Sequence, residues 1–153
     1  METLLKNKKA RFNYEIIDTL EAGLKLKGWE VKSLREKKGS LTEAYIRYQT
    51  EDGSFFLVSA HIPPYQAENK GIGEKDSYRP RKLLLHKKEI EKLQQELKQK
   101  GLALIPLDIH TQGKYIKMNI ALARGKKKVD KRKTLRDRAL KRDIARVMKQ
   151  RLR

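Results

Sequence analysis

The stretch from Glu21 to Arg35 constrains the fold of this chain more than any other part of the sequence. Its apolar residues alternate at Leu24 and Leu26 and are spaced more widely from Trp29 to Leu34. Alternation is typical of a half-buried strand and the wider spacing of a helix, so the stretch predicts a strand that leads into a short helix. Four Lys and Arg side chains are interleaved with the apolar ones. We therefore expect a wall with the core on one side and a solvated, cationic surface on the other.

The remaining apolar residues fall mostly into short strand patterns. Strands are predicted at 12–20, 45–49, 55–62, 102–109 and 115–123, and a helix is predicted at 87–100, just before Gly101. Asp52-Gly53, between the second and third of these strands, indicates a hairpin. Within 55–62, Val58, Ala60 and Ile62 are expected on one face. Residues 1–9 are polar and are expected to fray, while 63–82 form a long polar loop that is either functional or disordered.

These elements predict an α+β fold that is mainly β. Several short strands with two helices favour a small antiparallel β-barrel, because closure of the sheet removes exposed edges. Oligonucleotide-binding folds have this composition. After Arg124 the density of apolar residues falls sharply. The chain is therefore divided into a barrel domain, 1–123, and a basic tail, 124–153.

The charge of the chain predicts a polyanionic partner. It carries 38 Lys and Arg against 19 Asp and Glu, a formal net charge of +19. Nucleic acid is the first expectation and an anionic membrane the second. No apolar run is long enough to span a bilayer, so no membrane partner is retained. The chain has no cysteine, which excludes disulfides and thiolate metal sites and fits a cytoplasmic protein.

The tail holds much of this charge in a segment that resembles an amphipathic helix. Fifteen Lys and Arg and three Asp after Ala123 give it a net charge of +12. Leu140, Ile144, Val147 and Met148 fall on one helical stripe. Because the surrounding cations repel one another, we expect disorder in the free protein and a helix once a polyanion neutralises the charge.

Basic side chains near the Glu21–Arg35 stretch are candidates for contacts to nucleic-acid phosphates. If they share one face, the affinity falls steeply with salt, since each neutralised phosphate releases counterions. The alternative is a set of scattered, solvated cations, and it is favoured for any one lysine taken alone. The six candidates are Lys8, Lys9, Arg11, Lys25, Lys32 and Arg35.

The sequence favours a binding protein over an enzyme. His61, His86 and His110 are far apart and show no metal-ligand spacing. No Gly-rich phosphate loop and no nucleophile elbow is present. We therefore predict no enzymatic activity, no metal and no cofactor. Trp29 is interpreted as a core residue in preference to a base-stacking one.

Four sequence blocks identify a resemblance to a known family. Glu21-Ala-Gly-Leu24 with Gly28-Trp-Glu-Val-Lys-Ser-Leu-Arg35 resembles the signature of the small protein B family of SsrA-binding proteins. Three further blocks agree in order: 7–11, 79–86 and 125–132. The resemblance implies an oligonucleotide-binding-like barrel that binds the tRNA-like domain of transfer-messenger RNA and takes part in the rescue of stalled ribosomes.

The resemblance also implies roles for three residues of the body. Asn7, Glu21 and Leu84 match family positions needed for binding to transfer-messenger RNA. A carboxylate at Glu21 would accept hydrogen bonds from base N–H groups of unpaired RNA. The alternatives are a cap or ion pair for Glu21, a polar terminal residue for Asn7, and a core position for Leu84. From the residues alone, the core position is favoured for Leu84.

For the tail, the resemblance implies contacts with the ribosome. Asp130, Lys131 and Arg132 match the element that precedes the segment inserted into the ribosome. Lys126, Lys127 and Lys128 would contact ribosomal RNA, and Val147 and Met148 would lie in the inserted helix. Many members carry an aromatic residue or histidine where this chain has Val129, so stacking there is not expected.

The function implied is that of an adaptor. It would enter the decoding site of the stalled ribosome with elongation factor Tu and the charged RNA, and its tail would probe the empty mRNA channel. The alternative is a general RNA-binding or ribosomal protein without specificity for transfer-messenger RNA.

Overall fold

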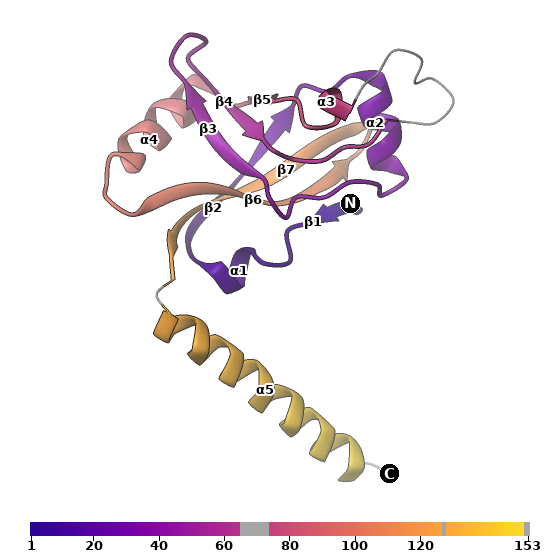
Figure 1. The fold of residues 1–153 in the computed structure, drawn as a ribbon, viewed down its shortest axis with the longest axis vertical. Helices are drawn as coiled ribbons and strands as arrows, with labels where there is room; N and C mark the ends of the chain where they lie inside the picture. Colours follow the sequence, from indigo (N-terminus) through magenta and orange to yellow (C-terminus); the bar gives the residue numbers. More distant parts are fainter. Residues whose placement is uncertain (65–73, 127, 152–153) are drawn as a thin grey trace.

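The computed structural model describes residues 1–64, 74–126 and 128–151. Strands and helices follow one another along the chain as in Figure 1. The strands are β1 (Thr3–Lys6), β2 (Tyr14–Leu24), β3 (Tyr45–Gln49), β4 (Ser54–Val58), β5 (Arg81–Leu84), β6 (Leu102–Gln112) and β7 (Tyr115–Gly125). The helices are α1 (Ala10–Asn13), α2 (Gly28–Arg35), α3 (Glu74–Ser77), α4 (Lys87–Leu97) and α5 (Lys128–Arg151).

The strands form one curved antiparallel sheet in the order β1-β6-β7-β2-β5-β4-β3. Strands β6, β7 and β2 are long and form its centre, as Figure 1 shows. The predicted α+β, mainly β fold is confirmed. The sheet curls so that β3 packs near β6, but the hydrogen-bonded order of the described strands ends at β1 and β3 and does not close. The fold is therefore barrel-like, without full closure.

The strand and short helix predicted for Glu21 to Arg35 are confirmed. Strand β2 runs into Leu24, and α2 begins at Gly28. Leu34 is fully buried, and Trp29 is half-buried against the main core. The interpretation of Trp29 as a core residue is therefore supported.

The prediction that residues 1–9 fray is wrong. Strand β1 pairs with β6, and both Leu4 and Leu5 are buried. Two adjacent residues of a regular strand point to opposite faces. Here the register shifts between Thr3 and Leu5, which allows both leucines to reach the core. The strand was missed because an irregular strand has no alternating pattern to recognise.

The predicted strand at 55–62 is also shorter than expected. Strand β4 ends at Val58, and Ser59 adopts a φ of 61°. This left-handed residue reverses which side of the chain is buried. Before it Phe55 and Leu57 lie in the core, and after it Ala60 and Ile62 do. The alternation predicted across the whole segment therefore does not hold.

The other strand and helix predictions are confirmed with small shifts in their ends. The hairpin at Asp52-Gly53 joins β3 to β4. Helix α4 ends at Leu97, before Gly101 with a φ of 86°. Along β7 the residues that alternate into the core are Ile116, Met118, Ile120 and Leu122. Of the predicted loop at 63–82, residues 65–73 lie outside the described part of the chain, and the rest contains α3 and the start of β5.

A buried ion pair joins α2 to β5. Glu30 and Arg81 are both fully buried, and Arg81 Nε donates to Glu30 Oε2 at 2.6 Å. Arg79 contacts the other carboxylate oxygen, which also accepts the Lys27 backbone N–H at 2.7 Å. Burial lowers the pKa of the Arg81 guanidinium, and the hydrogen bond and charge of Glu30 act to raise it. Two of the sequence blocks thus meet in the interior.

The Arg81 guanidinium extends this connection to the segment after β4. It donates to the carbonyl oxygens of Ala60 at 2.7 Å and Ser77 at 3.0 Å. A buried guanidinium needs partners for its N–H groups, because each unpaired one costs desolvation energy. These bonds hold α2, α3, β5 and the end of the β4 segment together.

Helix α5 leaves the sheet and points away from it, as Figure 1 shows. Its stripe residues Leu140, Ile144, Val147 and Met148 are between 49% and 61% exposed. It contacts the body near α1, where the Arg138 guanidinium lies 6.0 Å from the centre of the Phe12 ring. The tail is therefore helical in this structure, and the prediction that a polyanion induces the helix stays a prediction. The predicted disorder of the tail in the free protein stays a prediction.

The expected boundary between body and tail falls inside β7, which runs to Gly125. The Lys126 backbone N–H then donates to the carbonyl oxygen of Asn13 at 2.9 Å. The body therefore extends to Lys126, and the tail follows it.

Glu30→Gln is expected to lower the free energy of unfolding by about 3–5 kcal/mol, because it leaves the buried charge of Arg81 without its counter-charge. Glu36→Gln is the matched control, since Glu36 forms an exposed ion pair with Lys38. Its loss should cost about 0.5 kcal/mol or less. Urea unfolding followed by circular dichroism measures both. Equal costs for the two variants would contradict the role given to the buried pair.

Candidate nucleic-acid interface

Two neighbouring rows of side chains cross the central strands on one face of the sheet. Strand register places the members of each row opposite one another, and partners in an antiparallel pair share a face. The first row is Glu21, Asn119 and Asp108, from β2, β7 and β6. The second row is Leu84, Gly23, Lys117 and His110, from β5, β2, β7 and β6.

The polar members of these rows form one hydrogen-bonded network. His110 Nε2 lies 3.0 Å from Glu21 Oε2, and His110 Nδ1 lies 2.8 Å from Asp108 Oδ1. Asn119 Nδ2 donates to both oxygens of Asp108, at 3.1 and 3.2 Å. Lys117 Nζ lies 3.5 Å from the second oxygen of Glu21. The ion-pair alternative for Glu21 is therefore present, and it leaves the carboxylate 35% exposed.

Leu84 lies on the surface beside this network. Its side chain is 52% exposed, whereas that of Leu83 is 2% exposed. The core position that the residues alone favoured for Leu84 is therefore wrong, and Leu83 occupies it. A run of three leucines does not show which of them faces inward; the strand register decides it.

Gly23 explains how Leu84 can lie so close to β2. A Cβ atom built on Gly23 would be 3.1 Å from Leu84 Cβ, closer than ordinary van der Waals contact. The glycine of the Glu21-Ala-Gly-Leu block therefore makes room for the leucine of another block.

A cleft of about 460 Å³ lies between this face and α4. Glu21, Leu84 and Lys117 line it together with Lys82 and His86. It combines two carboxylates, Glu21 and Glu89, with an exposed apolar side chain and two cations. Proteins that recognise unpaired nucleotides use this combination, because bases offer hydrogen-bonding edges and apolar faces beside phosphates.

Asn7 is anchored to the edge of the same sheet. Its Nδ2 donates to the carbonyl oxygen of Pro106 at 2.9 Å, and its backbone N–H to that of Leu107 at 2.8 Å. Asn7 is therefore not merely a polar terminal residue. It holds the turn into α1 against β6.

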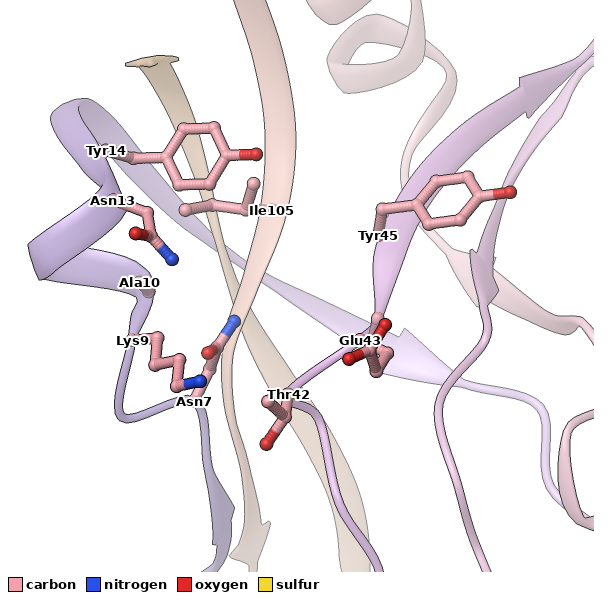
Figure 2. A pocket seen from close by; sticks show the side chains of 10 residues that line it. Asn7, Lys9, Ala10, Asn13, Tyr14, Thr42, Glu43, Tyr45 and Ile105 are labelled. Carbon is pink, nitrogen blue, oxygen red and sulfur yellow. The ribbon is translucent and has the colours of Figure 1, made fainter. Parts of the chain in front are cut away.

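Two clefts flank Asn7. One, of about 390 Å³, lies between α1 and the start of β3, and Figure 2 shows Lys9, Asn13, Tyr14 and Tyr45 around it. The other, of about 240 Å³, is lined by Lys8, Arg11 and Asp108 among others. The second cleft brings the N-terminal cations to Asp108, at the far end of the network that holds Glu21.

The six predicted phosphate-contacting cations do not form one cluster. Lys8, Lys9 and Arg11 gather at α1, whereas Lys32 and Arg35 are on α2, which lies at a distance from α1 in Figure 1. Lys25 follows β2 and lines another cleft together with Lys82. The six cations therefore form separate basic patches and not the single predicted face. Residues that are close in sequence are moved apart where the chain turns from β2 into α2.

The structure describes part of the predicted tail site. Lys126 Nζ donates to the carbonyl oxygen of Arg11 at 2.9 Å, which ties the end of the body to α1. Arg132, Val147 and Met148 are exposed. Lys127 lies outside the described residues. For Lys128, Asp130 and Lys131 the helical backbone is described and the side chains are not.

Sequence reasoning missed four residues of the network: Asp108, His110, Lys117 and Asn119. In the sequence alone, His110 is an isolated histidine without metal-ligand spacing. A signal was present, because polar residues alternate with core residues at 108 and 110 in one strand and at 117 and 119 in the next. Their convergence on Glu21 depends on the strand register, which the pattern does not contain.

Among the residues that the structure describes, no group of three or more His, Asp or Glu side chains is arranged so that it could hold a metal ion. Over the same residues, no helix is both long and apolar enough to cross a membrane.

The curved sheet, its polar face with an exposed leucine and the cationic helix define a small, mainly β protein with an open, charged sheet face. Comparison with known proteins identifies its family. The chain belongs to the family described as SmpB protein, whose model matches residues 4–150. The resemblance identified from four sequence blocks is thereby confirmed.

Individual relatives match over nearly the whole chain. The SsrA-binding protein of Parvibaculum lavamentivorans is 50% identical, covering 94% of this chain and 86% of its own. That of Staphylococcus carnosus is 45% identical, covering 97% and 93%. A chain of the solved structure "tmRNA-SmpB: a journey to the center of the bacterial ribosome" is 46% identical. It has a TM-score of 0.65, with 81% of this chain and 85% of that one covered.

Leu84→Ala is expected to cost about 1 kcal/mol or less in the free energy of unfolding, because half of the side chain already contacts water. Leu83→Ala, its neighbour, should cost about 2–5 kcal/mol, since it opens a cavity in the core. Urea unfolding of the two variants measures the difference. If Leu84→Ala is the more costly change, the exposure assigned to Leu84 is wrong.

Proposed function

We propose that this chain binds the tRNA-like domain of transfer-messenger RNA and helps to deliver it to stalled ribosomes for trans-translation. The observation that carries the proposal is the Glu21 carboxylate, fixed beside exposed Leu84 and Lys117 on one sheet face. The relatives named for SsrA binding and the solved tmRNA-SmpB structure support it.

In this proposal the body carries RNA recognition. Glu21 accepts hydrogen bonds from base N–H groups, Leu84 packs against a base or sugar, and Lys117 contacts phosphate. The cations at α1 and α2 add salt-dependent affinity from separate sides. Asn7 acts by holding the turn that carries Lys8, Lys9 and Arg11.

The tail acts on the ribosome. Helix α5 is 24 residues long, which at a rise of 1.5 Å per residue gives about 36 Å. That length suits a probe of an mRNA channel. The protein would act in the cytoplasm as a non-enzymatic adaptor, entering the decoding site together with elongation factor Tu and the charged RNA.

A general RNA-binding protein would share the charge and the sheet but not the arrangement at Glu21. Competition between transfer-messenger RNA and ordinary tRNA distinguishes the two functions. The proposed adaptor keeps its transfer-messenger RNA in excess tRNA, while a general binder exchanges it.

Glu21→Gln tests the proposed recognition through the sign of its effect. If the carboxylate accepts hydrogen bonds from bases, one acceptor becomes a donor and binding weakens by about 1–3 kcal/mol. If Glu21 only lies near phosphates, loss of its negative charge strengthens binding. Affinity for transfer-messenger RNA is measured by filter binding at fixed salt. Glu15→Gln, an exposed change on the same strand, is the control and should leave binding equal or slightly stronger.

Ile144→Pro tests the role of α5. Ile144 is 54% exposed in the middle of the helix, and a proline in a helix interior costs about 3 kcal/mol or more. We expect ribosome rescue to be lost in a reconstituted trans-translation assay, with unchanged affinity for transfer-messenger RNA.

Two controls accompany this variant. Ile144→Ala keeps the helix and should retain more rescue activity than the proline variant, while truncation after Lys126 should abolish rescue and spare RNA binding. Normal rescue by Ile144→Pro would show that the tail acts as a flexible cationic tether.

In the free protein, NMR should show poorly dispersed signals for the tail.

A further inference from the structure

We propose that His110 is a positioning residue for RNA recognition: as a buried imidazolium it fixes the orientation of the Glu21 carboxylate and offsets its charge. This inference rests on the proposed function of Glu21. Its own basis is the geometry of a histidine that is 1% exposed and lies between two carboxylates.

The two short contacts of the ring are the basis for assigning it two N–H groups. Nε2 faces Glu21 Oε2 at 3.0 Å, and Nδ1 faces Asp108 Oδ1 at 2.8 Å. Ionised carboxylates only accept hydrogen bonds, so each ring nitrogen must donate, and imidazole with two N–H groups carries a positive charge. Asp108 is held as an acceptor by the amide of Asn119, which donates to both of its oxygens.

The surrounding charges balance this arrangement. The titratable groups that face His110 are Glu21 on β2, Asp108 on β6 and Lys117 on β7, where Lys117 is paired with Glu21. Two carboxylates and two cations thus share one cluster. A buried charge is tolerated when it is paired and hydrogen-bonded, and removal of one partner leaves the others uncompensated.

The consequence for RNA binding concerns one oxygen of Glu21. His110 contacts Oε2 at 3.0 Å, and Oε1 lies 3.5 Å from Lys117 Nζ, so the two contacts restrict the orientation of the carboxylate. A side chain already held in its binding orientation loses less entropy when it binds. The positive ring also reduces the repulsion between Glu21 and the phosphates of the RNA.

A double-mutant cycle tests the coupling. His110→Gln, Glu21→Gln and the double variant are assayed for affinity to transfer-messenger RNA at about pH 7 and fixed salt. A glutamine carries its two N–H donors on a single nitrogen, so it does not reproduce the two donors that the imidazole ring presents from separate nitrogens. We expect His110→Gln to weaken binding about tenfold, and the double variant to bind no more weakly than Glu21→Gln alone, because coupled residues are not additive.

The control is His61→Gln. His61 is half-buried, its ring centroid is 4.9 Å from that of Tyr78, and it is not part of the network. We expect its affinity to stay within about twofold of the unchanged protein. Independent, multiplicative losses in the cycle, or no loss with His110→Gln, overturn the inference. If Glu21→Gln itself has no effect, the proposed function of this face fails instead.

A spectroscopic measurement does not depend on the folding of a variant at position 110. Nitrogen-15 NMR of the histidine rings in the full-length protein should show both nitrogens of His110 protonated at neutral pH. Glu21→Gln should shift the ring toward the neutral form with a single N–H, because one carboxylate partner is lost. A neutral His110 ring in the unchanged protein overturns the inference.

Discussion

The position of β5, the strand that brings Leu84 to the recognition face, depends on the buried pair of Glu30 and Arg81. A carboxylate and a guanidinium without water are stable only together and with their remaining groups hydrogen-bonded. Arg81 meets this condition through Glu30 and through the carbonyl oxygens of Ala60 and Ser77. Strand β5 begins at Arg81, so the pair fixes the position of β5 relative to α2.

That position decides what the next residues of β5 do. Three residues after the buried arginine, Leu84 lies opposite Gly23 and is exposed beside Glu21. Residues of the same sequence blocks therefore have different roles. Glu30, Arg79 and Arg81 build the interior, Gly23 provides room, and Glu21 and Leu84 form the surface. A conservative change at one of these interior residues would therefore affect RNA binding indirectly, because it would alter the register of β5 and the position of Leu84.

Much of the fold could be predicted from the sequence because its long elements have regular patterns. The alternation in 115–123 was sufficient to predict β7, and the apolar stripe at 87–100 was sufficient to predict α4. Local irregularities were not predictable: two adjacent leucines share the core through a register shift, and Ser59 reverses the buried side. The site was found in part, through Glu21. His110 and Asp108 were missed because their meeting with Glu21 is a property of three strands in register.

The exposed stripe on α5 has a consequence for how copies of this protein behave toward one another. Leu140, Ile144 and Met148 form an apolar surface that another copy of the same helix could cover. The surrounding Lys and Arg oppose that encounter, since like charges repel over about 10 Å at 0.1 M salt. The cations proposed to attract RNA therefore also oppose self-association through this helix. Concentrated salt weakens both effects at once, so a preparation stripped of nucleic acid by high salt loses its colloidal protection in the same step.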